Sequence, residues 1–238
     1  MVVSGVQNRL MANKHKLLLI SCLISIMIML GCNRKPQNMV VVPEGEFMKG
    51  EPGSGSEKKI FLKVFYIDKF EVTNKEYKQF VDKTKHREPK DWALYGYREE
   101  LNDYPVVYVS FEDASEYCKW SGKRLPTEDE WEKAARGTDA RIYPWGNEFE
   151  KDKSNTSLSG IVETTKVGTY KEGKSPFGLY DMAGNVWEWT SSGYENNKMS
   201  VKGGSWGISH QFAKTFARSG YDQDTRINNL GFRCARDK

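Results

Sequence analysis

Apolar and polar residues alternate in recognisable patterns only in the first half of this chain. Residues 40–43 and 46–48 predict two short strands around a turn at 43–45, because β-branched and aromatic residues flank a Pro-Glu-Gly sequence. Residues 60–72 are rich in β-branched and aromatic side chains and predict a further strand. Past Gly137 the periodicity is lost.

Three helices are predicted by the signals at their N-termini. Thr73 and Thr127 each precede a Glu by three residues, which is the pattern of a capping box, and Ser110 stands at a third start. Gly122 and Gly137 predict where the second and third helices end. The apolar positions that follow at helical spacing are Tyr77, Phe80 and Val81; Ala114, Tyr117, Cys118 and Ser121; and Trp131, Ala134 and Ala135.

The segment after Gly137 is rich in Gly, Asn and Trp and has little periodicity. Such a composition predicts long loops that cover buried Trp rings, and loops of this length are usually functional or held by ligands.

The N-terminus predicts a secretory signal with a lipid-attachment site. Residues 17–30 are an apolar run of 14 residues behind Lys14 and Lys16, too short to span a membrane but typical of a signal peptide. The run ends in Met-Leu-Gly-Cys, which resembles a bacterial lipobox, so Cys32 is expected to carry the acyl chains. The alternative is ordinary secretion with Cys32 free. Met11 offers a second start position.

These features divide the chain into a signal peptide (1–31), a lipidated tether (32–38) and a folded domain (39–238). The six residues after Cys32 reach about 20 Å when fully extended, so the domain is expected close to the membrane surface. Asn33 stands where an Asp commonly retains lipoproteins in an inner membrane, which favours an outer membrane and a periplasm-facing domain.

Charge and histidine content exclude several functions. The 238 residues carry 36 basic and 32 acidic side chains, and residues 1–31 hold three of the basic ones and no acidic one. The remainder therefore has 33 basic against 32 acidic residues, without a basic patch for nucleic acid. His86 and His210 are the only histidines past the signal, which excludes a His-based zinc site and leaves a Ser-His-Asp triad without a nucleophile motif.

Several segments together resemble the formylglycine-generating enzyme family, also called sulfatase-modifying factors. The resemblance covers nearly all of 39–238 and implies a compact α+β fold, similar to C-type lectin-like domains, with little regular secondary structure. The segments that carry it most clearly are 109–114 (Val-Ser-Phe-Glu-Asp-Ala), 122–131 (Gly-Lys-Arg-Leu-Pro-Thr-Glu-Asp-Glu-Trp), 178–189 (Gly-Leu-Tyr-Asp-Met-Ala-Gly-Asn-Val-Trp-Glu-Trp), 203–206 (Gly-Gly-Ser-Trp) and 230–234 (Leu-Gly-Phe-Arg-Cys).

Oxidases of this family use two cysteines, five residues apart, that follow the Gly-Gly-Ser-aromatic motif. As thiolates they bind copper, which with dioxygen converts a substrate Cys to formylglycine. The matching positions here are Ile208 and Ala213, and residues 200–233 contain no Cys. We therefore expect no copper and no oxidase activity of the family type.

The resemblance also implies a disulfide and a calcium ion. Cys118 and Cys234 match a structural disulfide of the family, which an oxidising compartment permits; two buried free thiols are the alternative. At the first calcium site, the ligands that the family implies are the carbonyls of Ala183, Gly184 and Val186 and the carboxylate of Glu188. A second calcium site of the family would begin at Asn155, but this chain lacks the acidic residue that completes that site. The alternative for Glu188 is an ion pair with Arg124 or Arg233.

Four residues match or adjoin the family's substrate groove: Ser205, Trp206, His210 and Arg233. They predict contacts with a peptide or small molecule, and His210 is a candidate base or ligand. The alternatives are a core role for Trp206, an ion pair for Arg233 and a surface position for His210.

The sequence thus predicts a membrane-anchored lipoprotein whose domain is a binding or scaffold module, with a peptide, glycan or envelope protein as partner. The alternative is an enzyme of the family whose chemistry does not use the cysteine pair, as in siderophore-tailoring oxidases. Ergothioneine-type sulfoxide synthases are a poor match, because they need an extra helical domain and histidines that this chain lacks.

Overall fold

The computed structural model describes residues 38–238; the predicted signal peptide, Cys32 and residues 33–37 of the tether lie outside them. Within these residues nine strands form three sheets, and helices join or cover them, as expected for an α+β fold. The strands are β1 (Met39–Val42), β2 (Gly45–Lys49), β3 (Lys58–Leu62), β4 (Phe65–Asp68), β5 (Trp187–Gly193), β6 (Met199–Lys202), β7 (Arg218–Tyr221), β8 (Leu230–Gly231) and β9 (Ala235–Asp237).

The three predicted helices begin where their capping residues indicate. They are α2 (Asn74–Thr84), α4 (Phe111–Trp120) and α5 (Glu128–Arg136). Thr73, Ser110 and Thr127 each accept a hydrogen bond from the amide three residues on, and the acidic side chain there accepts one from the amide of the capping residue. A further helix, α3 (Lys90–Tyr95), was not predicted, because it has six residues and Pro89 provides no side-chain cap.

The prediction of one strand over residues 60–72 is wrong. Lys63, an exposed residue, interrupts the segment, so that β3 and β4 belong to different sheets. β3 pairs with β2 in a hairpin, with Phe47 opposite Ile60. β4 lies between β1 and β9 in a three-stranded sheet, in which Val42 and Asp237 both stand opposite Phe65.

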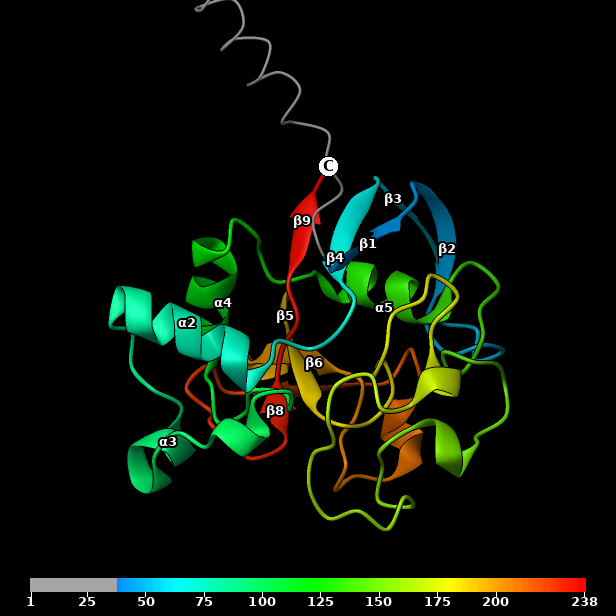
Figure 1. Ribbon diagram of the computed structural model, residues 1–238. Helices are drawn as coiled ribbons and strands as arrows, with labels where there is room; N and C mark the ends of the chain where they lie inside the picture. Colours follow the sequence, from blue (N-terminus) through cyan, green and yellow to red (C-terminus); the bar gives the residue numbers. More distant parts are fainter. Residues whose placement is uncertain (1–37) are drawn as a thin grey trace, which may run out of the picture. The chain divides into compact units, whose positions relative to one another are not determined.

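Helix α5 packs on this three-stranded sheet and closes one of the two cores (Figure 1). Burial of each large apolar side chain contributes about 1.5–3 kcal/mol relative to leaving it exposed. This core includes Val42, Phe65, Ile67, Trp131, Ala134, Ala135, Leu179, Met182 and Ala235.

The second core lies between helices α2 and α4 and a four-stranded sheet of order β7-β6-β5-β8. Trp187 and Trp189 on β5 are buried in it together with stacked Tyr77 and Tyr117, whose ring centroids are 5.6 Å apart. The expectation of Trp rings buried only under loops is therefore too simple, since β5 begins with four buried residues and shows no alternation by which a strand is recognised.

Between α5 and β5, however, the chain runs in long loops, as predicted. The loops lie on the side of the domain away from α2, α3 and α4 (Figure 1). The short 3₁₀ helices of the described chain are η2 (Glu99–Leu101), η3 (Lys151–Lys153), η4 (Lys171–Gly173), η5 (Glu195–Asn197) and η6 (His210–Ala213).

Candidate functional site

The Gly-Gly-Ser-Trp segment makes a tight turn against the second core. Gly204 has a φ of +72°, and a Cβ there would stand 3.0 Å from the backbone of Phe212, so a larger residue does not fit. Ser205 is buried, and its hydroxyl accepts a hydrogen bond from the Asn229 side chain at 2.9 Å. Trp206 is half-buried, and its amide donates to the Asn185 carbonyl.

The two positions that the resemblance matches to the cysteines of the oxidases are packed as apolar positions. Ile208 packs against the second core, and Ala213 is buried at the end of η6. The cysteines of the described chain are elsewhere: Cys118 on α4 and Cys234 before β9 form a disulfide inside the second core. The disulfide that the resemblance implied is thus present.

A groove of about 250 Å³ opens beside Trp206. Its walls come from α3 and η2, from the segment 104–108, from the loop 162–164 and from Asn228. Tyr108 lines it with an unusual φ of +59°, held there because its amide donates to Ile227 and its carbonyl accepts from Arg226. We call this the Trp206 groove.

Asp91 of α3 is the polar group of this groove that sequence reasoning missed. One of its carboxylate oxygens, Oδ1, is buried and has no hydrogen-bond partner within the described residues. The other lies 3.8 Å from Arg98, and burial raises the pKa of the carboxyl above its ordinary value. An acid in the first turn of a helix is common, so no sequence signal marked it.

Two exposed apolar side chains belong to elements that form the Trp206 groove. Val162 lines the groove and is 81% exposed, and Tyr95, on the same helix as Asp91, is 76% exposed. Exposed apolar residues at the edge of a concave site are consistent with an interaction surface.

Of the four predicted groove residues only Trp206 lines the groove, whereas Ser205, His210 and Arg233 do not. The His210 ring lies tilted against Phe149, with ring centroids 4.3 Å apart, and the side chain also contacts Gln211. Arg233 is fully buried and donates from Nε and Nη2 to the two carboxylate oxygens of Glu188, at 2.7 Å each. The ion-pair alternative for Glu188 is therefore present, and Arg124 instead pairs with Glu130 and Asp237.

Glu188 belongs to a group of buried carboxyls with too few cations. Its Oε2 also accepts from the Trp131 indole at 2.8 Å, so both oxygens have partners. Glu71, bonded to Asn185, is buried among other acids, and burial together with Asp181 and Glu188 raises its pKa well above the ordinary value. These three carboxyls share Arg233.

Asp181 is the least satisfied of the three. Burial raises its pKa to about 6, although the Gly168 amide, which donates to Oδ2 at 2.6 Å, acts in the opposite direction. Its Oδ1 is buried without a partner. An orphaned carboxylate oxygen next to the segment 183–186 fits a cation there better than Glu188 does.

Asn155 braces the predicted second calcium loop through its own side chain. Its Oδ1 accepts from Ser159 at 2.9 Å, and its Nδ2 donates to the Glu163 carbonyl at 2.9 Å. Gly184 approaches so closely that a Cβ there would stand 2.1 Å from the Asn155 carbonyl oxygen. Within residues 38–238 no three His, Cys, Asp or Glu side chains gather in a way that would hold a metal.

No helix in the described part of the chain is both long and apolar enough to cross a membrane.

Comparisons with known proteins agree on one family. The model of the sulfatase-modifying factor enzyme 1-like domain matches residues 29–238. The chain is 34% identical over 269 residues to the inactive Cα-formylglycine-generating enzyme 2 of Bos taurus, covering 85% of this chain and 89% of that protein. It is 29% identical over 286 residues to the formylglycine-generating enzyme of Streptomyces coelicolor, covering 86% and 90%.

Among solved structures, PvdO from Pseudomonas aeruginosa is similar with a TM-score of 0.71 and 25% identity, over 84% of this chain and 94% of that one. The crystal structure of CarF has a TM-score of 0.66 at 21% identity, over 85% and 99%, and shows likeness of fold.

Proposed function

Because the chain belongs to the sulfatase-modifying factor family, we propose that it is a lipid-anchored binding module of a bacterial envelope, which holds a peptide-like ligand in the Trp206 groove. The observation that carries this proposal is the pair Ile208 and Ala213. Copper oxidation of the family type needs two thiolates there, and an aliphatic and a methyl side chain supply none. A relative that is 34% identical is itself named inactive, which supports the same conclusion.

The groove supplies the binding chemistry. Asp91 lines the groove and has a buried, unpartnered Oδ1; a ligand N–H that reached this oxygen would satisfy it, away from water. Val162 and Tyr95 offer apolar contact area beside it. A short peptide segment with an amide or cationic donor flanked by apolar side chains matches this arrangement.

The anchor rests on the sequence motif at Cys32. The six-residue tether places the domain within about 20 Å of the membrane that holds the acyl chains. A ligand held in the groove would then be kept at the membrane surface, which suits a scaffold of an envelope assembly. The lipid anchor would be contradicted if the wild-type protein did not incorporate labelled fatty acid, or if the Cys32→Ala variant remained in the membrane fraction.

We also propose a calcium ion beside the segment 183–186, with Asp181 as its carboxylate ligand. The unpartnered Oδ1 of Asp181 supports this, and the carbonyls of Ala183, Gly184 and Val186 are the oxygen donors that the family implies. Glu188 then stabilises the fold through its ion pair with Arg233 and is not a calcium ligand. The ion would neutralise the excess of buried negative charge and hold the loop that carries Asn185, to which Trp206 is bonded.

The proposal is tested by photo-crosslinking in intact cells. A photoreactive residue at Tyr95 should capture one envelope partner, and the same residue at Lys119, which is also exposed but lies on α4, should not. Trp206→Ala should abolish the capture at Tyr95. Equal capture at both positions would contradict the assignment of the groove.

A second experiment addresses the oxidase directly. The purified chain, loaded with Cu(I) and supplied with oxygen, should leave the cysteine of a sulfatase-motif peptide unchanged. Formation of formylglycine would overturn the binding-module proposal.

A further inference from the structure

The domain has a second cavity, of about 580 Å³, between the β2–β3 hairpin, the first half of α5 and the segment that leads into β7. It shares no lining residue with the Trp206 groove. We propose that this hairpin pocket is a ligand site for a small molecule that carries one carboxylate on a ring or a branched aliphatic skeleton. Its volume is in the range of small-molecule sites.

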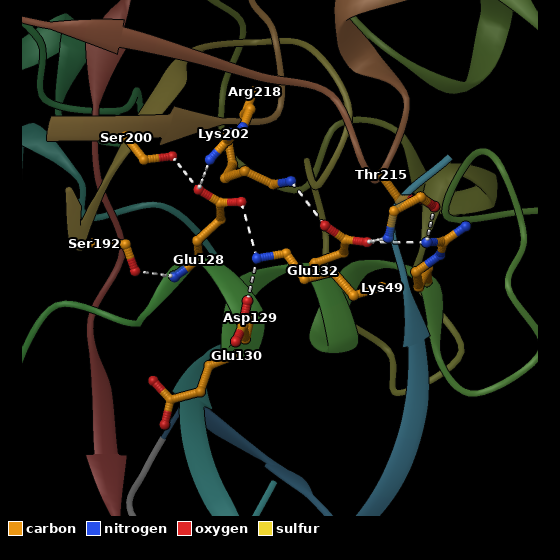
Figure 2. Close-up of polar contacts among 12 residues, drawn as sticks. Lys49, Glu128, Asp129, Glu130, Glu132, Ser192, Ser200, Lys202, Thr215 and Arg218 are labelled. Carbon is orange, nitrogen blue, oxygen red and sulfur yellow. Dashed lines mark hydrogen bonds and ion pairs between the residues drawn. The ribbon is translucent and has the colours of Figure 1, made fainter. Parts of the chain in front are cut away.

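The floor of the hairpin pocket is charged, buried and already satisfied (Figure 2). Glu132 accepts from Arg136 at 2.9 Å, from Lys202 at 3.1 Å and from the Gly50 amide at 2.8 Å. Glu128 accepts from the Ser200 hydroxyl at 2.7 Å. Because the carboxylates of the floor already have hydrogen-bond partners, the floor is rigid and needs no ligand to satisfy its polar groups.

The walls, in contrast, carry cationic groups with unused donors. Lys58 lines the pocket and makes no ion pair within the described residues. Arg218 makes one long contact to Glu128, at 3.4 Å, and its guanidinium is held over the Tyr194 ring at 5.1 Å. Since a guanidinium has five N–H donors and an ammonium three, both residues can bond an anion in the pocket.

The lining itself is balanced in formal charge: its cations are Lys49, Lys58 and Arg218, and its acids are Glu51, Glu128 and Glu132. Lys49 lies 3.2 Å from Glu128 and 2.5 Å from Asp129, so it is already shared between two acids. Glu132 is paired with Arg136 and Lys202 below the lining. A ligand with a single negative charge therefore meets the unused donors of Lys58 and Arg218.

An apolar surface lies between these charges. Ile60 of β3 and Phe216 line the pocket, and both are half-buried. Arg136 and Lys214 each lie 5.7 Å from the centre of the Phe216 ring, which fixes its orientation. A ring placed against Phe216 and Ile60 directs its carboxylate to the cations of the wall.

The test uses the full chain in detergent and 4-fluorobenzoate as the probe, followed by ¹⁹F NMR line broadening. We expect saturable binding of the acid, and none of 4-fluorobenzamide, which has the same shape without the charge. Lys58→Gln and Arg218→Gln should each weaken binding by about fivefold or more, as expected for a lost charge-assisted hydrogen bond. Lys58 is exposed and makes no ion pair, so its substitution does not threaten the fold.

Lys59→Gln is the matched control. Lys59 is the next residue of the same strand, faces the other way and pairs with Glu46 at 2.7 Å, so its loss should leave binding unchanged. Asp91→Asn in the Trp206 groove should also leave it unchanged. Absence of binding, equal binding of acid and amide, or equal affinities of Lys58→Gln, Arg218→Gln and the wild type would overturn the proposal.

Discussion

Arg233 and Glu188 form a bidentate ion pair in which neither side chain is exposed. The pair joins β5 to the segment before β9, and Arg233 further donates to the carbonyls of Asp68 and Tyr180. A buried ion pair of this kind adds little stability compared with a well-packed apolar pair. Removing one partner is nevertheless strongly destabilising, because it leaves the other charge buried and unpaired.

Arg233→Met should therefore lower the free energy of unfolding by about 3–5 kcal/mol, because it leaves the Glu188 carboxylate buried without its cation. Urea unfolding measures this. Lys59→Met, which removes an exposed pair with Glu46, should cost about 0–1 kcal/mol. A loss below about 1 kcal/mol for Arg233→Met would show that water or another cation replaces the arginine.

The disulfide makes a separate contribution. The double substitution Cys118→Ser with Cys234→Ser should lower the free energy of unfolding by about 2–5 kcal/mol, because the bridge closes a loop of 116 residues in the unfolded chain. Urea unfolding of the wild type with and without a reductant should show the same difference. A reductant effect on the double variant would point to another cause.

The stability contributed by Asp113 should depend on pH. Its carboxylate is buried and accepts from His86 at 2.8 Å and Arg87 at 2.6 Å; burial alone would raise its pKa, but these bonds and that of the Ser110 amide lower it. Since the folded pKa lies below the unfolded one, the ionised form stabilises the fold above the unfolded pKa.

We expect the stability difference between the wild type and Asp113→Asn to be complete at pH 6 and to shrink below about pH 4, as the pH falls through the folded pKa. Unfolding curves collected across this range test it. A difference that stays constant down to pH 2 would contradict the ionic role.

Calcium should stabilise the chain through Asp181. A Ca²⁺ ion that binds only the folded state stabilises it by an amount that grows with the logarithm of the free Ca²⁺ concentration above Kd, so adding Ca²⁺ after EGTA treatment should raise Tm by several degrees. Asp181→Asn should abolish this shift, whereas Asp82→Asn on the surface of α2 should preserve it. An unchanged Tm in the wild type would remove the calcium proposal.

Asp91→Asn should separate binding from folding. Asparagine has nearly the same shape as aspartate, and the Asp91 carboxylate is partly buried with one oxygen that has no hydrogen-bond partner. The free energy of unfolding of the variant should therefore be unchanged or higher. Capture of the partner by a photoreactive residue at Tyr95 should nevertheless be lost. Asp103→Asn, an exposed neighbour of η2, is the control that should retain capture.

Local features were predictable because their partners are close in the sequence. The capping boxes at Thr73 and Thr127 join residues three apart, and the structure has both. The family segments predicted the fold and the disulfide as well. The strand over 60–72 and the short helix α3 were misjudged, because a single exposed Lys63 and an uncapped start at Pro89 carry little local signal.

By itself, the sequence determined the family, the absence of Cys from residues 200–233, and the starts of the three capped helices. Only the tertiary structure decided that Arg233 pairs with Glu188, that Asp91 lines the Trp206 groove with a buried oxygen left unpartnered, and that Lys58 and Arg218 share a pocket. The physical reason is that the energy and the binding role of a charged side chain depend on how far it is removed from water and on which groups it pairs with. These come from segments far apart in the chain, and folding alone brings them together.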